Sequence, residues 1–254
     1  MKMRLSIMVL VCVAALSAKA SVIYTENFET YNTGVTLNAQ GSWTAAGDPQ
    51  VIQGVGTNTT KVLSNGTAIS TPSKAITLSW GANTMGSLSF DTYFGGTTAN
   101  VGYVGIGKGT TNYLGFYLTG NTITFRPGAA AGDQTTMVNG SGVSTVVATG
   151  KWYNVTANFT LTNNTITDVW LTNQTDGGAA VQLYFGAAGN ATRVYTEAGD
   201  EAGWTTAMLR LPASTSSIRM IDNIQVSAIP EPATIGMLGL GVLITLGVRR
   251  KFMV

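Results

Sequence analysis

The sequence contains no histidine, a single cysteine (Cys12) and few charged residues, which make up 10% of its 254 positions. Without histidine the chain lacks the commonest general base and the commonest metal ligand in proteins. One cysteine allows no disulfide within the chain, so the fold has to be stabilised by its core. The low charge is unlike a helical bundle, whereas 31 glycines and abundant threonine favour strands and turns. These absences argue against most classes of enzyme.

The net positive charge of the chain comes from its two ends. Three of the 14 basic residues precede position 21 and three follow position 248. Between 21 and 229, eight basic residues stand against eleven acidic ones, a net charge of −3. No cluster of lysine and arginine interrupts this span, so we expect no nucleic-acid partner.

Residues 1–20 have the three parts of a secretory signal peptide. Two basic residues supply the positive start, and a twelve-residue apolar run follows over 5–16. This run is shorter than the roughly 17–25 residues of a membrane-spanning helix. Ala18-Lys19-Ala20 offers the small-x-small cleavage pattern, so we expect the exported chain to begin at Ser21. The pattern predicts export through the general secretion machinery and removal of Cys12 with the peptide.

The C-terminal segment, 230–254, also has three parts. Pro230-Glu231-Pro232 is followed by sixteen uncharged residues over 233–248 and then by the basic cluster Arg249-Arg250-Lys251. A basic cluster after an apolar segment predicts a transmembrane segment whose end stays in the cytoplasm. Sixteen helical residues span roughly 24 Å, short against a hydrocarbon core of about 30 Å. We therefore expect a temporary anchor in the inner membrane.

This arrangement resembles the PEP-CTERM sorting signal: a Pro-Glu-Pro motif, a short Gly- and Leu-rich membrane segment and an Arg cluster. The resemblance covers about 229–251, roughly a tenth of the chain. It implies that the protein is a substrate of an exosortase, a membrane transpeptidase-like enzyme of certain Gram-negative bacteria. Such substrates are cut near the Pro-Glu-Pro motif and passed to the cell surface or to an exopolysaccharide matrix. An ordinary anchor that is never cut is the alternative, and neither makes this chain a catalyst.

Between 21 and 229 the hydrophobic pattern has a period of two. In 151–161, five apolar residues at odd positions alternate with polar ones, which predicts a strand with one buried face. Comparable patterns occur at 87–94, 112–118, 123–125, 167–172, 180–185 and 218–226. About twelve short strands separated by turns predict an all-β domain, a two-sheet antiparallel sandwich with no second domain.

Two segments at the ends of this span are similar to concanavalin A-like jelly rolls. They are Asn-Phe-Glu at 27–29, at the entry to the first strand, and Ile-Asp-Asn-Ile at 221–224, in the last strand. The superfamily includes lectins, laminin-G-type modules and some glucanases, so the resemblance implies a jelly roll, with an immunoglobulin-like sandwich as the alternative. The glucanases of this class present Glu-x-Asp-x-x-Glu on one strand. That spacing is absent here, and we expect neither catalytic residues nor enzymatic activity.

A structural calcium ion is one hypothesis for the acidic residues. Asp222 falls within the apolar alternation of the last strand, where a carboxylate is costly unless it is paired or bound to a metal. Jelly-roll modules often hold Ca²⁺ between their first and last strands, and Glu26 or Glu29 could supply a second carboxylate. The alternative is that Asp222 lies at a β-bulge, or pairs with Arg219, Arg210 or a backbone amide. No other cofactor is expected.

Glycan binding is a second hypothesis. Trp152 and Trp170 lie opposite the apolar positions of their strands, and Asp168 shares that polar side with Trp170. An exposed indole can stack on a sugar, although tryptophan is more often buried. We therefore expect a non-catalytic structural or adhesive protein of the cell surface or matrix, with a carbohydrate-binding module acting on exopolysaccharide or environmental glycans as the alternative.

Overall fold

The computed structural model describes most of the chain between its two end segments. The described residues are 20–45, 47–65, 71–80, 85–96, 101–108, 111–127, 134–144, 147–195, 204–210 and 219–229. Within them the chain forms sixteen strands and one short 3-10 helix, η1 (Leu37–Ala39). No helix in this part of the chain is long and apolar enough to cross a membrane. The segment 230–254 and residues 1–19 of the expected signal peptide lie outside the described residues.

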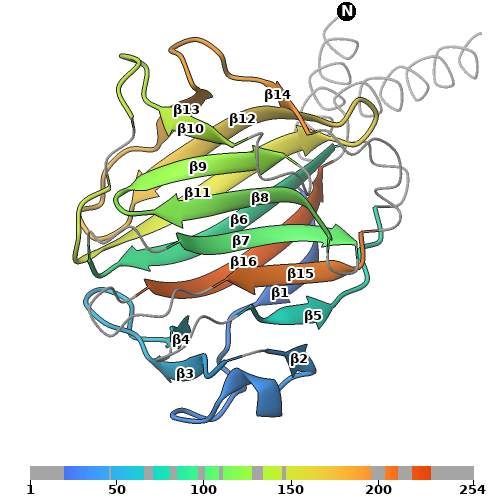
Figure 1. The fold of residues 1–254 in the computed structure, drawn as a ribbon, viewed down its shortest axis with the longest axis vertical. Helices are drawn as coiled ribbons and strands as arrows, with labels where there is room; N and C mark the ends of the chain where they lie inside the picture. The colour runs from blue at the N-terminus through green and yellow to red at the C-terminus, as the bar shows by residue number, and fades with distance from the viewer. Residues whose placement is uncertain are drawn as a thin grey trace, which may run out of the picture.

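The described strands form one continuous antiparallel sheet that folds into two layers (Figure 1). The front layer consists, in spatial order, of β2 (Trp43–Thr44), β5 (Ser73–Ala75), β15 (Thr206–Arg210), β7 (Val101–Lys108), β8 (Thr111–Thr119) and β9 (Thr122–Pro127). The back layer consists of β13 (Val181–Phe185), β12 (Thr165–Asn173), β11 (Lys151–Thr160), β6 (Met85–Phe94), β16 (Arg219–Ile229), β4 (Lys61–Ser64) and β3 (Gln50–Gln53). Two further strands lie on this layer, β1 (Ser21–Glu26) on β16 and β14 (Arg193–Val194) on β12. The predicted two-sheet sandwich is confirmed.

The two layers are joined at one corner by β10 (Thr135–Val138). Its first two residues pair with β9 in the front layer, and its last two pair with β13 in the back layer. One short strand therefore carries the hydrogen-bonded ladder from one sheet to the other.

The core lies between the layers and follows the alternation of the sequence. In β11 the residues Tyr153, Val155, Ala157 and Phe159 all belong to the main buried cluster. Four phenylalanines continue this cluster from layer to layer. Phe90 contacts Phe116 at 6.2 Å, Phe116 contacts Phe125 at 5.6 Å and Phe125 contacts Phe185 at 5.3 Å between ring centroids. Aromatic pairs at these separations add about 0.5–1.5 kcal/mol each beyond the area that they bury.

Strand β16 lies inside the back layer, with β6 on one side and both β4 and β1 on the other. A β-bulge interrupts it between Asp222 and Gln225, where Asn223 has a φ of 48°. The strand continues to Ile229, so Ser227–Ile229, which follow the last strand predicted from the sequence at 218–226, are also part of the sheet.

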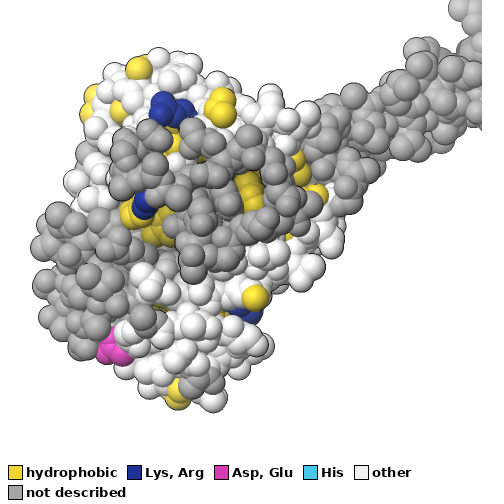
Figure 2. All heavy atoms as spheres, turned by 45° about the vertical axis from the view of Figure 1, so that its right-hand side comes forward, with side chains coloured by type: hydrophobic (Ala, Val, Ile, Leu, Met, Phe, Trp, Pro, Cys, Tyr) yellow, Lys and Arg dark blue, Asp and Glu magenta, His cyan; other side chains and the backbone are white. Residues whose placement is uncertain are grey.

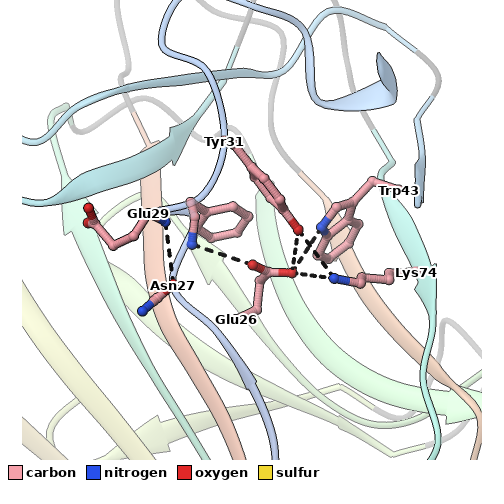
Figure 3. A network of polar contacts seen from close by, with 7 residues as sticks. Glu26, Asn27, Glu29, Tyr31, Trp43 and Lys74 are labelled. Atoms are coloured by element: carbon pink, nitrogen blue, oxygen red, sulfur yellow. Dashed lines mark hydrogen bonds and ion pairs between the residues drawn. The ribbon is translucent and has the colours of Figure 1, made fainter. Parts of the chain in front are cut away.

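The chain that follows β1 is held against the sandwich by one buried carboxylate, that of Glu26 (Figure 3). Its Oε2 accepts hydrogen bonds from the hydroxyl of Tyr31 at 2.8 Å, the indole nitrogen of Trp43 at 3.2 Å and the ammonium of Lys74 at 2.6 Å. The Lys74 ammonium also lies 5.7 Å from the centroid of the Trp43 ring. Burial alone would lower the pKa of Lys74, but its hydrogen bonds and charge interactions with Glu26 and Tyr31 together outweigh burial and raise the pKa. The network ties β1, the loop around η1 and β5 together.

Replacing Glu26 with glutamine should destabilise the domain. The amide cannot neutralise Lys74 and would present a donor to groups that are themselves donors, so we expect a loss of about 2 kcal/mol in the free energy of unfolding. Urea denaturation of the secreted domain measures this loss. Lys151→Gln is the control, because it breaks an ion pair with Asp176 that lies at the surface and should leave the unfolding midpoint unchanged. Equal effects of the two substitutions would contradict the assigned role of Glu26.

Candidate functional site

Part of the outer face of the back layer is an array of polar side chains. In the ladder of β6, β11 and β12, three rows of opposed residues run across this face. The rows are Asp91–Asn154–Thr172, Ser89–Thr156–Trp170 and Ser87–Asn158–Asp168. They include the polar positions that the sequence pattern placed on one side of 151–161, and this part of the prediction is confirmed.

Side-chain hydrogen bonds connect neighbouring members of the array. The Asn154 amide donates to the hydroxyl of Ser89 at 3.0 Å and to the carboxylate of Asp91 at 2.8 Å. The Thr156 hydroxyl donates to the Asn154 carbonyl oxygen at 2.8 Å. The array is therefore held in a fixed arrangement by short side chains, which lose little conformational entropy on ordering.

Trp170 is the exposed aromatic residue of this face, with 36% of its surface accessible. Its indole nitrogen donates to Asp168 Oδ1 at 2.7 Å, and the Asn158 amide donates to the same oxygen at 2.7 Å. The Asp168 carboxylate thus fixes the edge of the indole, while amide and hydroxyl groups lie beside the ring. An oriented, half-exposed ring with polar neighbours can stack on the apolar face of a sugar and hydrogen-bond its hydroxyls.

Trp152 lies on the outer face, as its position in the alternation predicted, but the expected exposure of its ring is wrong. Only 1% of its surface is accessible. The loop between β3 and β4 folds over it, and the indole nitrogen donates to the carbonyl oxygen of Val55 at 2.7 Å. Trp152 packs there with Val62 and Met220 in a small second core. In this conformation the ring is not available for stacking on a sugar.

The three acidic residues considered for calcium occupy separate networks. Glu26 is bound by Lys74, as described above, and Glu29 accepts a hydrogen bond from the backbone amide of Lys61 at 2.7 Å. Asp222 is contacted by the loop between β3 and β4. Within the described residues, no three His, Cys, Asp or Glu side chains lie together in a group that could hold a metal ion. The structure therefore does not assemble the calcium site suggested by the sequence.

The alternative for Asp222 is confirmed, because it lies at the bulge and its Oδ1 accepts the backbone amide of Asn223 at 2.8 Å. Its Oδ2 accepts the amide of Asn58 at 3.0 Å and the hydroxyl of Thr60 at 2.9 Å. The bulge also changes the alternation. Asp222 lies opposite Asp91 on the outer face, whereas Ile224 belongs to the main core.

Asp91 is a buried acid that the sequence pattern did not single out. Its carboxylate accepts hydrogen bonds from Asn154, from Gln174 at 3.0 Å and from the side chain of Asn223 at 2.8 Å. Asp91 and Asp222 are 5% and 0% exposed. Both carboxylates are surrounded by hydrogen-bond donors and closed off from solvent, so we assign the pair a structural role.

The sorting residues Pro230-Glu231-Pro232 and the basic cluster Arg249-Arg250-Lys251 lie outside the described residues. Ile229, the last residue of β16, precedes the Pro-Glu-Pro motif directly.

Stability should depend on pH through Asp222. Burial raises the pKa of Asp222 from 3.8 to about 6, although hydrogen bonds from Asn58, Asn223 and Thr60 oppose the shift. The folded state therefore binds this proton more tightly than the unfolded state, and the contribution of Asp222 to stability increases as the pH falls from about 6 to about 4. The shift corresponds to about 3 kcal/mol. Relative to Asp222→Asn, the wild-type domain should gain stability by that order in urea titrations between pH 7 and pH 4. A difference that does not vary with pH would contradict this.

Solved structures similar to this one include plant lectins. A peanut lectin, in a structure with a nine-residue peptide, has a TM-score of 0.51 at 13% identity and covers 82% of this chain and 98% of its own. Lectin II from Ulex europaeus has a TM-score of 0.51 at 10% identity and covers 82% of this chain and 99% of its own. A carbohydrate esterase of the Shiga toxin-encoding bacteriophage phi24B has a TM-score of 0.49 at 11% identity and covers 84% of this chain and 100% of its own. The similarity to the two lectins confirms the jelly roll and decides against the immunoglobulin-like alternative.

No curated protein matches the chain in sequence. Residues 228–251 match the model of the PEP-CTERM protein-sorting motif, which confirms the resemblance seen in the tail. The chain is therefore an all-β sandwich with the jelly-roll fold of the legume lectins, and it carries a PEP-CTERM sorting motif over 228–251 that begins in the last two residues of β16.

Proposed function

We propose that the protein is exported, held temporarily in the inner membrane and released by an exosortase to the cell surface or extracellular matrix of a Gram-negative bacterium. The observation that carries this proposal is the match of residues 228–251 to the sorting motif. The signal peptide starts export, the apolar segment 233–248 stops it, and Arg249-Arg250-Lys251 keep the end in the cytoplasm. Pro230-Glu231-Pro232 is then presented at the membrane boundary.

The sandwich itself has a non-catalytic structural or adhesive role in this proposal. The pair of opposed carboxylates at the outer face, Asp91 and Asp222, is buried and held by hydrogen-bond donors. On the side of the molecule shown in Figure 2, the charged side chains of the described residues are few and its hydrophobic ones are scattered.

Glycan binding is the second candidate function, and one observation favours it. Trp170 is exposed and its indole edge is fixed by Asp168, which is in turn held by Asn158. A ring oriented before binding loses little entropy when a sugar stacks on it. The solved lectins that share the fold are consistent with such a role. The two functions are compatible if the matrix is itself a polysaccharide.

Replacing Pro230 and Glu231 with alanine should block release. We expect the full-length form to accumulate in the inner membrane of a host with an active exosortase, because the enzyme loses its recognition motif. Fractionation and immunoblotting of the tagged protein measure the ratio of full-length to shortened chain. Release of a shortened chain at the wild-type rate would overturn the sorting proposal.

Replacing Trp170 with alanine should weaken glycan binding and preserve the fold. On a glycan array of the secreted domain we expect binding to weaken by at least about tenfold, because the stacking surface is lost. Val143→Ala is the control, since it truncates a hydrophobic side chain that is more exposed than Trp170, in the loop after β10. A wild-type domain that is folded and binds no glycan would leave the structural role as the function of the sandwich.

A further inference from the structure

The last residues of β16, from which the chain continues into the sorting motif, are paired within the sheet. Ala228 pairs with Gly86 of β6 on one side and with Ser21 of β1 on the other, and Ile229 pairs with Met85. Ala228 is 1% exposed and belongs to the main core. The last residues before the motif are therefore neither a linker nor a free strand end.

This end is also closed by a cluster of aromatic rings. Trp80 contacts Phe159 at 5.8 Å and Trp204 at 6.3 Å between centroids, and Phe159 contacts Trp204 at 5.7 Å. Gly86 lies directly beneath this cluster, because a Cβ there would be 2.6 Å from Phe159 and 2.7 Å from Trp80. Since Gly86 is the partner of Ala228, separating β16 from β6 at this point disturbs the packing of large buried rings. Such an opening costs far more than the fraying of an ordinary strand end.

The distance between the folded domain and the motif is consequently very short. Pro230 is two positions after Ala228, and Ala233, where the apolar segment begins, is five positions after it. A fully extended chain covers at most about 3.6 Å per residue, so Pro230 lies within roughly 7 Å of the sheet and Ala233 within roughly 18 Å. An enzyme that binds the motif as an extended peptide needs room on both sides of it.

We propose that the pairing of the end of β16 with β6 and β1 controls exosortase processing of this chain, so that the motif is cut only while residues 227–229 are released from the sheet. This inference rests on the proposed sorting function and adds its regulation. When opening and closing are fast compared with cleavage, the rate follows the population of the open form. The rate at which the protein is cut is thus set by the fraction of molecules in which residues 227–229 have left the sheet.

A disulfide across this end tests the proposal. Ser87 and Ser227 are directly opposed on β6 and β16, and opposed residues have Cβ atoms close enough for a disulfide. Cys12 is the only cysteine of the sequence, so the paired variant Ser87→Cys/Ser227→Cys forms one defined bridge after export. In a host with an active exosortase, pulse-chase labelling should show processing slowed by about tenfold or more, and a reductant should restore it.

Two further variants make the result specific. Ser89→Cys/Thr156→Cys places the same kind of bridge between β6 and β11, where the two hydroxyls are 3.1 Å apart, and it should be processed like the wild type. A flexible Gly-Ser spacer of about six residues between Ile229 and Pro230 adds on the order of 20 Å of chain. It should raise the processing rate several-fold, because the motif becomes accessible while the sandwich stays closed.

The outcomes separate this inference from the sorting function. Processing that depends on Pro230 and Glu231, but is equal in the wild-type, bridged and spacer forms, would overturn the inference and keep the sorting function. Processing of the spacer form with none of the wild type would support the inference strongly. If neither form is shortened, the sorting function fails and the inference fails with it.

Discussion

The contact between the two layers through phenylalanine rings is the interaction on which the rest of the structure depends. Phe90 and Phe185 come from the back layer, and Phe116 and Phe125 come from the front layer. The exported chain has no cysteine if the signal peptide is removed at Ser21, so no disulfide substitutes for this contact. Burial of apolar surface contributes roughly 25 cal/mol per Å², which makes a continuous aromatic core the main source of stability available to such a domain.

The alternation of polar and apolar residues was enough to predict the fold class and most of the long strands. Strand β11 follows it from Trp152 to Thr160, because both of its neighbours keep an unbroken register over most of their length. The pattern fails where a local irregularity enters the ladder. At Asp222 the bulge inserts an extra residue, so the positions that face the core have a different parity before and after it. The one feature of the sequence that marks this change is Asn223, a residue type that tolerates a positive φ.

The candidate site was predicted less completely, for a different physical reason. The period of two tells which face of a strand a side chain occupies, but it does not tell what covers that face. Trp152 and Trp170 lie on the same face, yet the loop after β3, about a hundred positions earlier in the chain, buries one and leaves the other exposed. The role of Asp91 was equally hidden, because its partners come from β11, β16 and the turn after β12.

The pairing of β1 with β16 joins the first strand to be secreted with the last of the described strands. Ser21 and Ala228 are direct partners, although roughly 200 residues lie between them, so the pairing closes a loop that contains nearly the whole domain. Pairings between residues so far apart in sequence form slowly. Closing the loop between them costs chain entropy before the contact contributes any stabilisation. During secretion, β1 emerges first and its partner last. The back layer therefore stays incomplete on the far side of the membrane until translocation has nearly ended. During that interval β6, which carries Leu88 and Phe90, lacks its partner β16 and is prone to aggregation.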